Sequence, residues 1–118
     1  MQSMKVNVLG SEYEMRFATR KELRMDNDTY GECYPYGKKV INICTDLDSG
    51  EELSSDEKLE MTKEVITHEL AHAFLYESGL VKYCNDETLV VWLSVNVNKL
   101  VSTSLGVFDT MNMIWQIL

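Results

Sequence analysis

The chain has 118 residues, of which 45% are hydrophobic and 25% charged, and its formal net charge is -8. This composition is ordinary for a globular protein, and the absence of a run of about 20 apolar residues argues against a membrane span. The acidic balance argues against a nucleic-acid-binding protein, because contacts to phosphate need Lys and Arg.

Cysteine usage indicates the compartment. The three cysteines, Cys33, Cys44 and Cys84, are an odd number without the spacing of a disulfide framework. Such a set is typical of reduced thiols in a reducing environment. Residues 1–5 also lack the apolar stretch of a secretory signal. We therefore expect a cytoplasmic protein that forms one domain over residues 1–118.

Short strands are predicted in the first third of the chain. Alternation of apolar and polar residues, as in residues 13–17, is typical of a half-buried strand. The turn signal Pro35-Tyr36-Gly37 separates two further strand-like runs. Loops are expected at 19–27 and 46–50. The expected strands cover residues 6–9, 13–17, 30–34 and 39–44.

Two long helices are predicted next, over residues 56–78 and 86–104. Ser54 and Glu57, three positions apart, form a capping-box pattern at the start of the first helix, and Gly79 is a natural stop. Strands followed by helices predict the α+β class. We expect a small antiparallel sheet packed on the first helix, with the second helix antiparallel to the first.

The second helix is more apolar than a single buried face requires. This pattern predicts that it lies in the centre of the domain or in a dimer contact. The apolar stretch at 110–118 is expected to fold back onto the domain, with a homodimer as the alternative.

Residues 68–72 carry the chemistry that the sequence predicts. They read His-Glu-Leu-Ala-His, and His68 and His72 are the only two histidines of the chain. This H-E-x-x-H pattern is typical of zinc metallopeptidases. Positions i and i+4 share one face of a helix, so both imidazoles can bind one Zn2+ ion. Glu69 between them is the candidate general base.

A catalytic zinc usually has three protein ligands, and the chain has no third histidine. Glu77 is expected to point to solvent, because it lies about 140° round the helix from His72. Glu87 opens the second helix and has the reach to return to the histidines. We predict Glu87 as the third ligand, with Asp86 or Cys84 as alternatives. The downstream candidates are Glu77, Cys84, Asp86, Glu87 and Asp109.

These residues resemble a known family, the small phage-encoded zincins related to the ImmA/IrrE metallopeptidases within the gluzincin group. The resemblance implies a zincin-like domain in which His68, His72 and Glu87 bind zinc and Glu69 is catalytic. It also implies a peptide substrate that pairs with an edge strand beside the cleft, and residues 36–43 are the candidate strand. The matching stretches are Tyr30-Gly31-Glu32, Val40-Ile41-Asn42-Ile43, Glu64 through Gly79, and Asn85-Asp86-Glu87.

Two functions are predicted from this pattern. The first is a zinc-dependent metallopeptidase that hydrolyses a protein or peptide substrate. The second is a non-catalytic zinc-binding protein, regulatory or interacting, of a phage or mobile element. A fourth protein ligand such as Cys84 would favour the second, because structural zinc sites are closed and catalytic sites are open.

Overall fold

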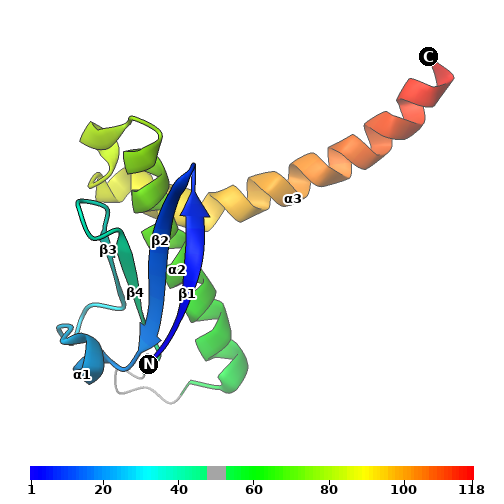
Figure 1. The fold of residues 1–118 in the computed structure, drawn as a ribbon. Coiled ribbons are helices and arrows are strands. Elements are labelled where there is room, and N and C mark those ends of the chain that lie inside the picture. Colours follow the sequence, from blue (N-terminus) through cyan, green and yellow to red (C-terminus); the bar gives the residue numbers. More distant parts are fainter. Residues whose placement is uncertain (48–52) are drawn as a thin grey trace.

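The protein has the predicted α+β class, with four strands that precede two long helices. The computed structural model describes residues 1–47 and 53–118, so the loop expected at 46–50 lies in part outside the described residues. Figure 1 shows α2 packed against the sheet and α3 leading away from both. The elements are β1 (Gln2–Val8), β2 (Ser11–Ala18), α1 (Arg20–Leu23), β3 (Gly31–Tyr34), β4 (Val40–Cys44), α2 (Ser55–Glu77), the 3-10 turn η1 (Val81–Tyr83) and α3 (Glu87–Ile117).

The sheet is mixed, with strand order β1-β2-β4-β3. The pairs β1–β2 and β3–β4 are antiparallel, but β2 and β4 run parallel, so the prediction of an antiparallel sheet was wrong. After β2 the chain crosses to the far edge and forms β3, and β4 then returns between them. The predicted edge strand at 36–43 was also wrong, because β4 is central and β3 is the edge strand.

The segment at 19–27, predicted as a loop, contains the four-residue helix α1. The Thr19 side chain accepts a hydrogen bond from the Glu22 amide, and the Glu22 carboxylate accepts one from the Thr19 amide, both at 3.2 Å. This reciprocal pair is a capping box. The Thr-x-x-Glu pattern at 19–22 therefore carried a helix signal within a polar segment.

Helix α2 forms where the sequence predicts it, and its capping box is confirmed. The Ser54 hydroxyl accepts from the Glu57 amide, and the Glu57 carboxylate accepts from the Ser54 amide, each at 3.2 Å. One face of α2 then packs on the sheet, and the fully buried Ala73 lets helix and strands approach closely. The core that joins them contains Val8, Tyr13, Met15, Ile41, Ile43 and Ala73.

The last turn of α2 is fixed to the sheet through Glu77. Its carboxylate accepts hydrogen bonds from Lys39 Nζ and Ser11 Oγ, both at 2.6 Å, and from the Tyr13 hydroxyl at 2.8 Å. The prediction that Glu77 points to solvent was wrong, because the strand ends reach over this end of α2. The Lys39 ammonium, with the two hydroxyl donors, lowers the pKa of Glu77 to about 2.

Helix α3 joins the two apolar segments that were predicted separately. It runs from Glu87 to Ile117 without a break, and the only proline of the chain, Pro35, lies outside it. Its first turns are anchored by Val90, which is fully buried beside Leu75 and Cys84. The remainder projects away from the domain (Figure 1), so the prediction that 110–118 folds back was wrong. In residues 1–47 and 53–118 no helix has the length of apolar sequence needed to cross a membrane.

Candidate metal centre

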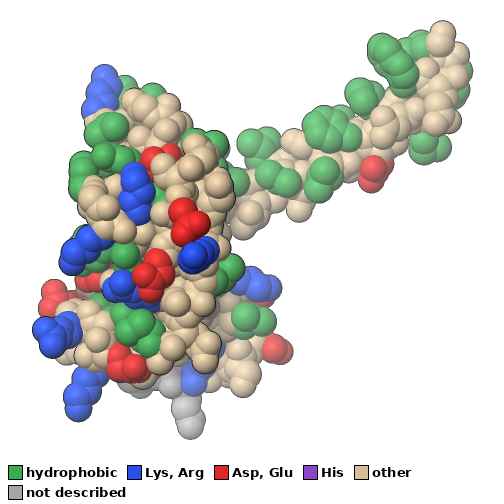
Figure 2. All heavy atoms as spheres, in the orientation of Figure 1, with side chains coloured by type: hydrophobic (Ala, Val, Ile, Leu, Met, Phe, Trp, Pro, Cys, Tyr) green, Lys and Arg blue, Asp and Glu red, His purple; other side chains and the backbone are tan. Residues whose placement is uncertain are grey.

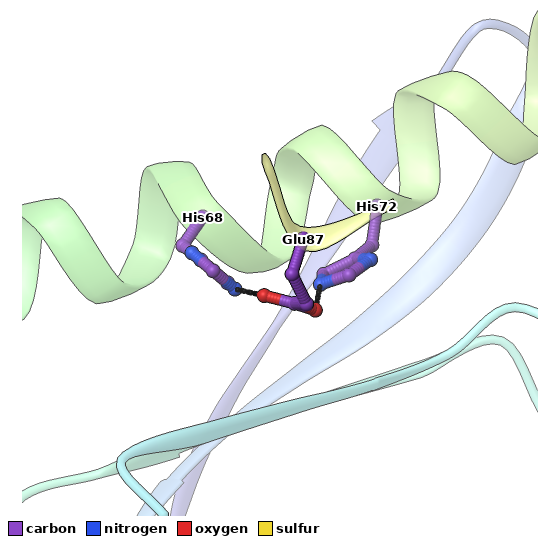
Figure 3. Close-up of side chains that lie close together, drawn as sticks. All are labelled: His68, His72 and Glu87. Carbon is purple, nitrogen blue, oxygen red and sulfur yellow. Dashed lines mark ion pairs between the residues drawn. The ribbon is translucent and has the colours of Figure 1, made fainter. Parts of the chain in front are cut away.

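His68 and His72 lie one turn apart on α2, on the side that faces α3. Their ring centroids are 5.1 Å apart. His72 is buried, with 8% of its surface exposed, and His68 is half-buried. Both Nε2 atoms point into the space between α2 and the start of α3 (Figure 3).

Glu87 reaches the histidines because the connection after α2 is short and tight. Gly79, with φ of 88°, ends the α2 segment, and Asp86 then caps α3 by accepting from the Leu89 amide. Glu87 therefore stands in the first turn of α3, opposite α2. Its Oε2 lies 3.2 Å from His68 Nε2 and its Oε1 lies 3.0 Å from His72 Nε2 (Figure 3).

The other ring nitrogen of His72 is held by the backbone. Nδ1 is hydrogen-bonded to the carbonyl oxygen of Cys84, in the same connection. A carbonyl only accepts, so Nδ1 carries the proton and Nε2 of the neutral ring carries the lone pair. Metal-binding histidines commonly have this arrangement, since a carbonyl on the far nitrogen fixes both the tautomer and the ring orientation.

The donor set fits a divalent cation. One ligand atom from each of His68, His72 and Glu87 lies within 4.8 Å of the others. His72 Nε2 faces the Glu87 carboxylate, and either a cation between them or a proton on Nε2 satisfies this contact. Burial lowers the pKa of His68, which favours its neutral form, although the Glu87 carboxylate acts in the opposite direction. Imidazole nitrogens and carboxylate oxygens are among the ligand types that zinc sites use.

Glu69 lies next to this cluster and is buried, with 6% of its surface exposed. Burial raises the pKa of its carboxyl group to about 8, and the charges of Glu87 and Glu32 act in the same direction. The edge strand β3 passes close to Glu69. A Cβ atom at Gly31 would lie 2.8 Å from Glu69 Oε2 and 2.8 Å from Val65 Cγ1, so only glycine fits here without a shift.

A cleft of about 500 Å³ opens over the cluster. The edge strand β3 and the segment before it form one wall, and α3 forms the other. Tyr30, which directly precedes β3, also lines this cleft. The lining residues that surround the cluster are Tyr30, Gly31, Val65, Val91, Ser94 and Val95.

The alternative ligands from the sequence do not join the cluster. The Asp86 carboxylate caps α3, and the Cys84 thiol lies 3.7 Å from the Tyr36 hydroxyl. Glu77 belongs to the ion pair with Lys39. Among the residues that the structure describes, the cluster that could hold a metal has three members, His68, His72 and Glu87.

Three features of the site were not predicted from the sequence. The contact of Gly31 with Glu69 depends on strand placement, although a glycine that opens a strand signals close backbone approach. The contact of the Cys84 carbonyl with His72 uses the backbone, so no residue type in the sequence indicates it. The cleft wall at Val95 depends on the direction in which α3 leaves the domain.

Comparison of the chain with known protein families, curated proteins and solved structures found no match. The functional argument therefore rests on the residues and geometry of this site.

Proposed function

We propose that the protein is a zinc-dependent metallopeptidase. The observation that carries the proposal is the hydrogen bond from His72 Nδ1 to the Cys84 carbonyl. It leaves Nε2 of this ring directed at Glu87, within reach of His68, in the arrangement that metal-binding histidines adopt. The H-E-x-x-H spacing and the buried Glu69 beside the cluster support the same reaction.

His68, His72 and Glu87 would hold the metal through two Nε2 atoms and a carboxylate oxygen. When bound, Zn2+ supplies a Lewis acid that polarises a peptide carbonyl and lowers the pKa of water to near neutrality. The three residues leave the cleft side of the cluster open, where the substrate carbonyl enters. This openness favours a catalytic site over a structural one.

Glu69 is the general base and general acid of the proposed reaction. Its carboxylate takes a proton from the attacking water and later passes it to the leaving amine, so that the C–N bond breaks with neutral products. A general base is most effective when its pKa is close to the working pH, and burial moves the pKa of Glu69 in that direction. Gly31 leaves the space that this carboxylate occupies, because a Cβ atom at this position would meet Glu69 Oε2.

The edge strand β3 is the proposed binding edge for the peptide substrate. It pairs with β4 on one side only, so its other edge is available to an extended peptide beside the cleft. The opposite wall is apolar where Val91 and Val95 line it. We therefore expect peptides with an apolar side chain next to the cleaved bond to be preferred.

The test combines zinc titration with cleavage of a peptide library that samples all side chains. The unmodified protein is expected to bind one zinc ion and cleave a subset of the library, while Glu69→Gln binds zinc and does not cleave. Absence of zinc binding, or cleavage retained by Glu69→Gln, would overturn the proposal. Zinc binding by a protein that cleaves no member would favour the non-catalytic alternative.

A further inference from the structure

The second half of α3 projects from the domain with its apolar side chains exposed. We call residues 98–118 the helical arm. Its only charged residues are Lys99 and Asp109. Figure 2 shows hydrophobic side chains spread along the arm, in contrast to the charged surface of the domain. The large exposed apolar residues of the arm are Leu100, Val101, Leu105, Val107, Phe108, Met111, Met113, Ile114, Trp115, Ile117 and Leu118.

One face of α3 has a heptad repeat that starts inside the domain and continues along the arm. At its start Val90 is buried and Leu93 packs beside it against α2. From Leu100 onward the same face is uncovered. A sustained alternation of three and four residues between apolar positions is typical of a helix that pairs with another helix. The positions are Val90, Leu93, Val97, Leu100, Ser104, Val107, Met111, Ile114 and Leu118, of which only Ser104 is polar.

We propose that this seam pairs with the same seam of a second copy of the chain, as an antiparallel helical dimer. A face with almost no charge is complementary to itself, which suits the isologous contact of a two-fold dimer. A lipid surface is a poorer occupant, because helices that lie on membranes carry Lys and Arg along their polar face and the arm has Lys99 alone.

The exposed seam supplies part of the area that a stable dimer needs. Its large apolar residues on the arm are Leu100, Val107, Met111, Ile114 and Leu118. At roughly 100 Å² for each half-exposed side chain of this size, they present on the order of 500 Å². A standard interface buries about 800 Å² on each partner, so the contact must also use the apolar surface at the base of the arm.

The antiparallel direction follows from a second apolar surface at the base of the arm. A cavity of about 420 Å³ lies between α2 and α3, lined by Leu70 and Phe74 of α2 and by Leu93 and Val97 of α3. Antiparallel pairing of the seam, with Leu100 opposite Met111, brings the last turn of the partner's arm to this cavity. A parallel pairing would leave the cavity and the exposed Phe74 uncovered.

The first test measures molar mass by light scattering or sedimentation on the full chain, at concentrations up to about 100 µM. We expect twice the chain mass of 13.6 kDa. Met111→Lys, within the seam, is expected to give the mass of one chain. Met113→Lys adds the same charge two positions away, outside the seam, and is expected to leave the dimer intact. Zinc titration of both variants checks that the domain is folded.

The second test fixes the direction and the kind of partner. Leu100→Cys and Met111→Cys variants are mixed and oxidised, and we expect the disulfide that joins one variant to the other. A monomeric wild-type chain, equal effects of Met111→Lys and Met113→Lys, or disulfides that join each variant to itself would overturn the antiparallel dimer. A monomer that sediments with phosphatidylcholine vesicles would instead assign the arm to a lipid surface.

Discussion

The Nδ1 atom of His72 is hydrogen-bonded to the carbonyl oxygen of Cys84. This contact joins the face of α2 that carries both histidines to the connection that positions Glu87. Cys84, whose carbonyl orients one proposed ligand, thus lies three positions before a second proposed ligand, Glu87. The connection therefore acts on the proposed site at two points, through a backbone oxygen and through a carboxylate.

Replacement of Cys84 by alanine should leave zinc affinity nearly unchanged. The contact to His72 uses the backbone carbonyl, which the substitution keeps, and the thiol lies against Tyr36. The protein should lose about 1 kcal/mol of stability, since the buried sulfur leaves a small gap. Calorimetric zinc titration of Cys84→Ala measures the affinity. A loss as large as that of His72→Ala would show that the thiol itself binds the metal.

Replacement of Glu87 by alanine should weaken zinc binding strongly. It removes one of the three proposed ligands, and even loss of a residue that only supports a ligand costs about 10–100-fold in affinity. We expect a decrease of at least about 100-fold in a competition assay with a chelator.

The neighbouring carboxylate provides a matched control for that experiment. Asp86→Ala removes the N-cap of α3. It should lower the free energy of unfolding by about 1 kcal/mol and retain zinc affinity. If Asp86→Ala and Glu87→Ala lowered zinc affinity equally, the start of α3 would affect the site only through its helical structure. Normal zinc binding by Glu87→Ala would refute the third ligand.

The amino-acid sequence predicted the local parts of the site better than the sheet. The spacing of His68 and His72, and the Ser54 capping box, depend on residues within one or two helical turns, so the pattern is visible in the chain. Among the downstream carboxylates and Cys84, reach and helix position favoured Glu87, which the structure brings to 3.2 Å from His68. Its role as a zinc ligand stays a prediction.

The predictions that failed depend on contacts between distant residues. Parallel pairing of β2 with β4 follows from a crossover that no local pattern encodes. Glu77 was placed by its angle on α2 alone, but its three partners come from the strands. Residues 110–118 were expected to fold back because they are apolar, whereas the unbroken helix α3 carries them away from the domain.

Replacement of Gly31 by alanine should impair catalysis while leaving the metal in place. The added Cβ would lie 2.8 Å from Glu69 Oε2, so the base or the strand must move. A displacement on the order of 1 Å in a catalytic group costs up to about 100-fold in rate. We expect turnover to fall at least tenfold on that basis, measured on the cleaved peptide.

Gly106 provides the matched control, because nothing lies within 4 Å of a Cβ atom there. Gly106→Ala, on the exposed surface of α3, should stabilise the helix by about 0.5–1 kcal/mol and leave turnover unchanged. If the two variants lose activity equally, the contact between Gly31 and Glu69 is not what positions the base.

Replacement of Glu77 by glutamine should destabilise the protein and weaken the dependence of its stability on pH in the acid range. The carboxylate accepts three hydrogen bonds with 10% of its side chain exposed, so its loss should cost about 1–3 kcal/mol near neutral pH. Because Lys39 lowers the pKa of Glu77 from 4.5 to about 2, its stabilisation is fully present above pH 4.5 and is lost as the pH falls toward 2. Denaturant unfolding at several pH values should therefore show the two proteins converging in acid.

The pair of Lys5 and Glu12 provides a control for this prediction on the same sheet. Their charged atoms are 3.5 Å apart, but the side chains are 80% and 67% exposed. Water and salt screen such a pair, so Glu12→Gln should change stability by less than about 1 kcal/mol. If Glu77→Gln were equally mild, or if its stability difference from the unmodified protein persisted at pH 2, the carboxylate would not be the anchor of α2 on the sheet.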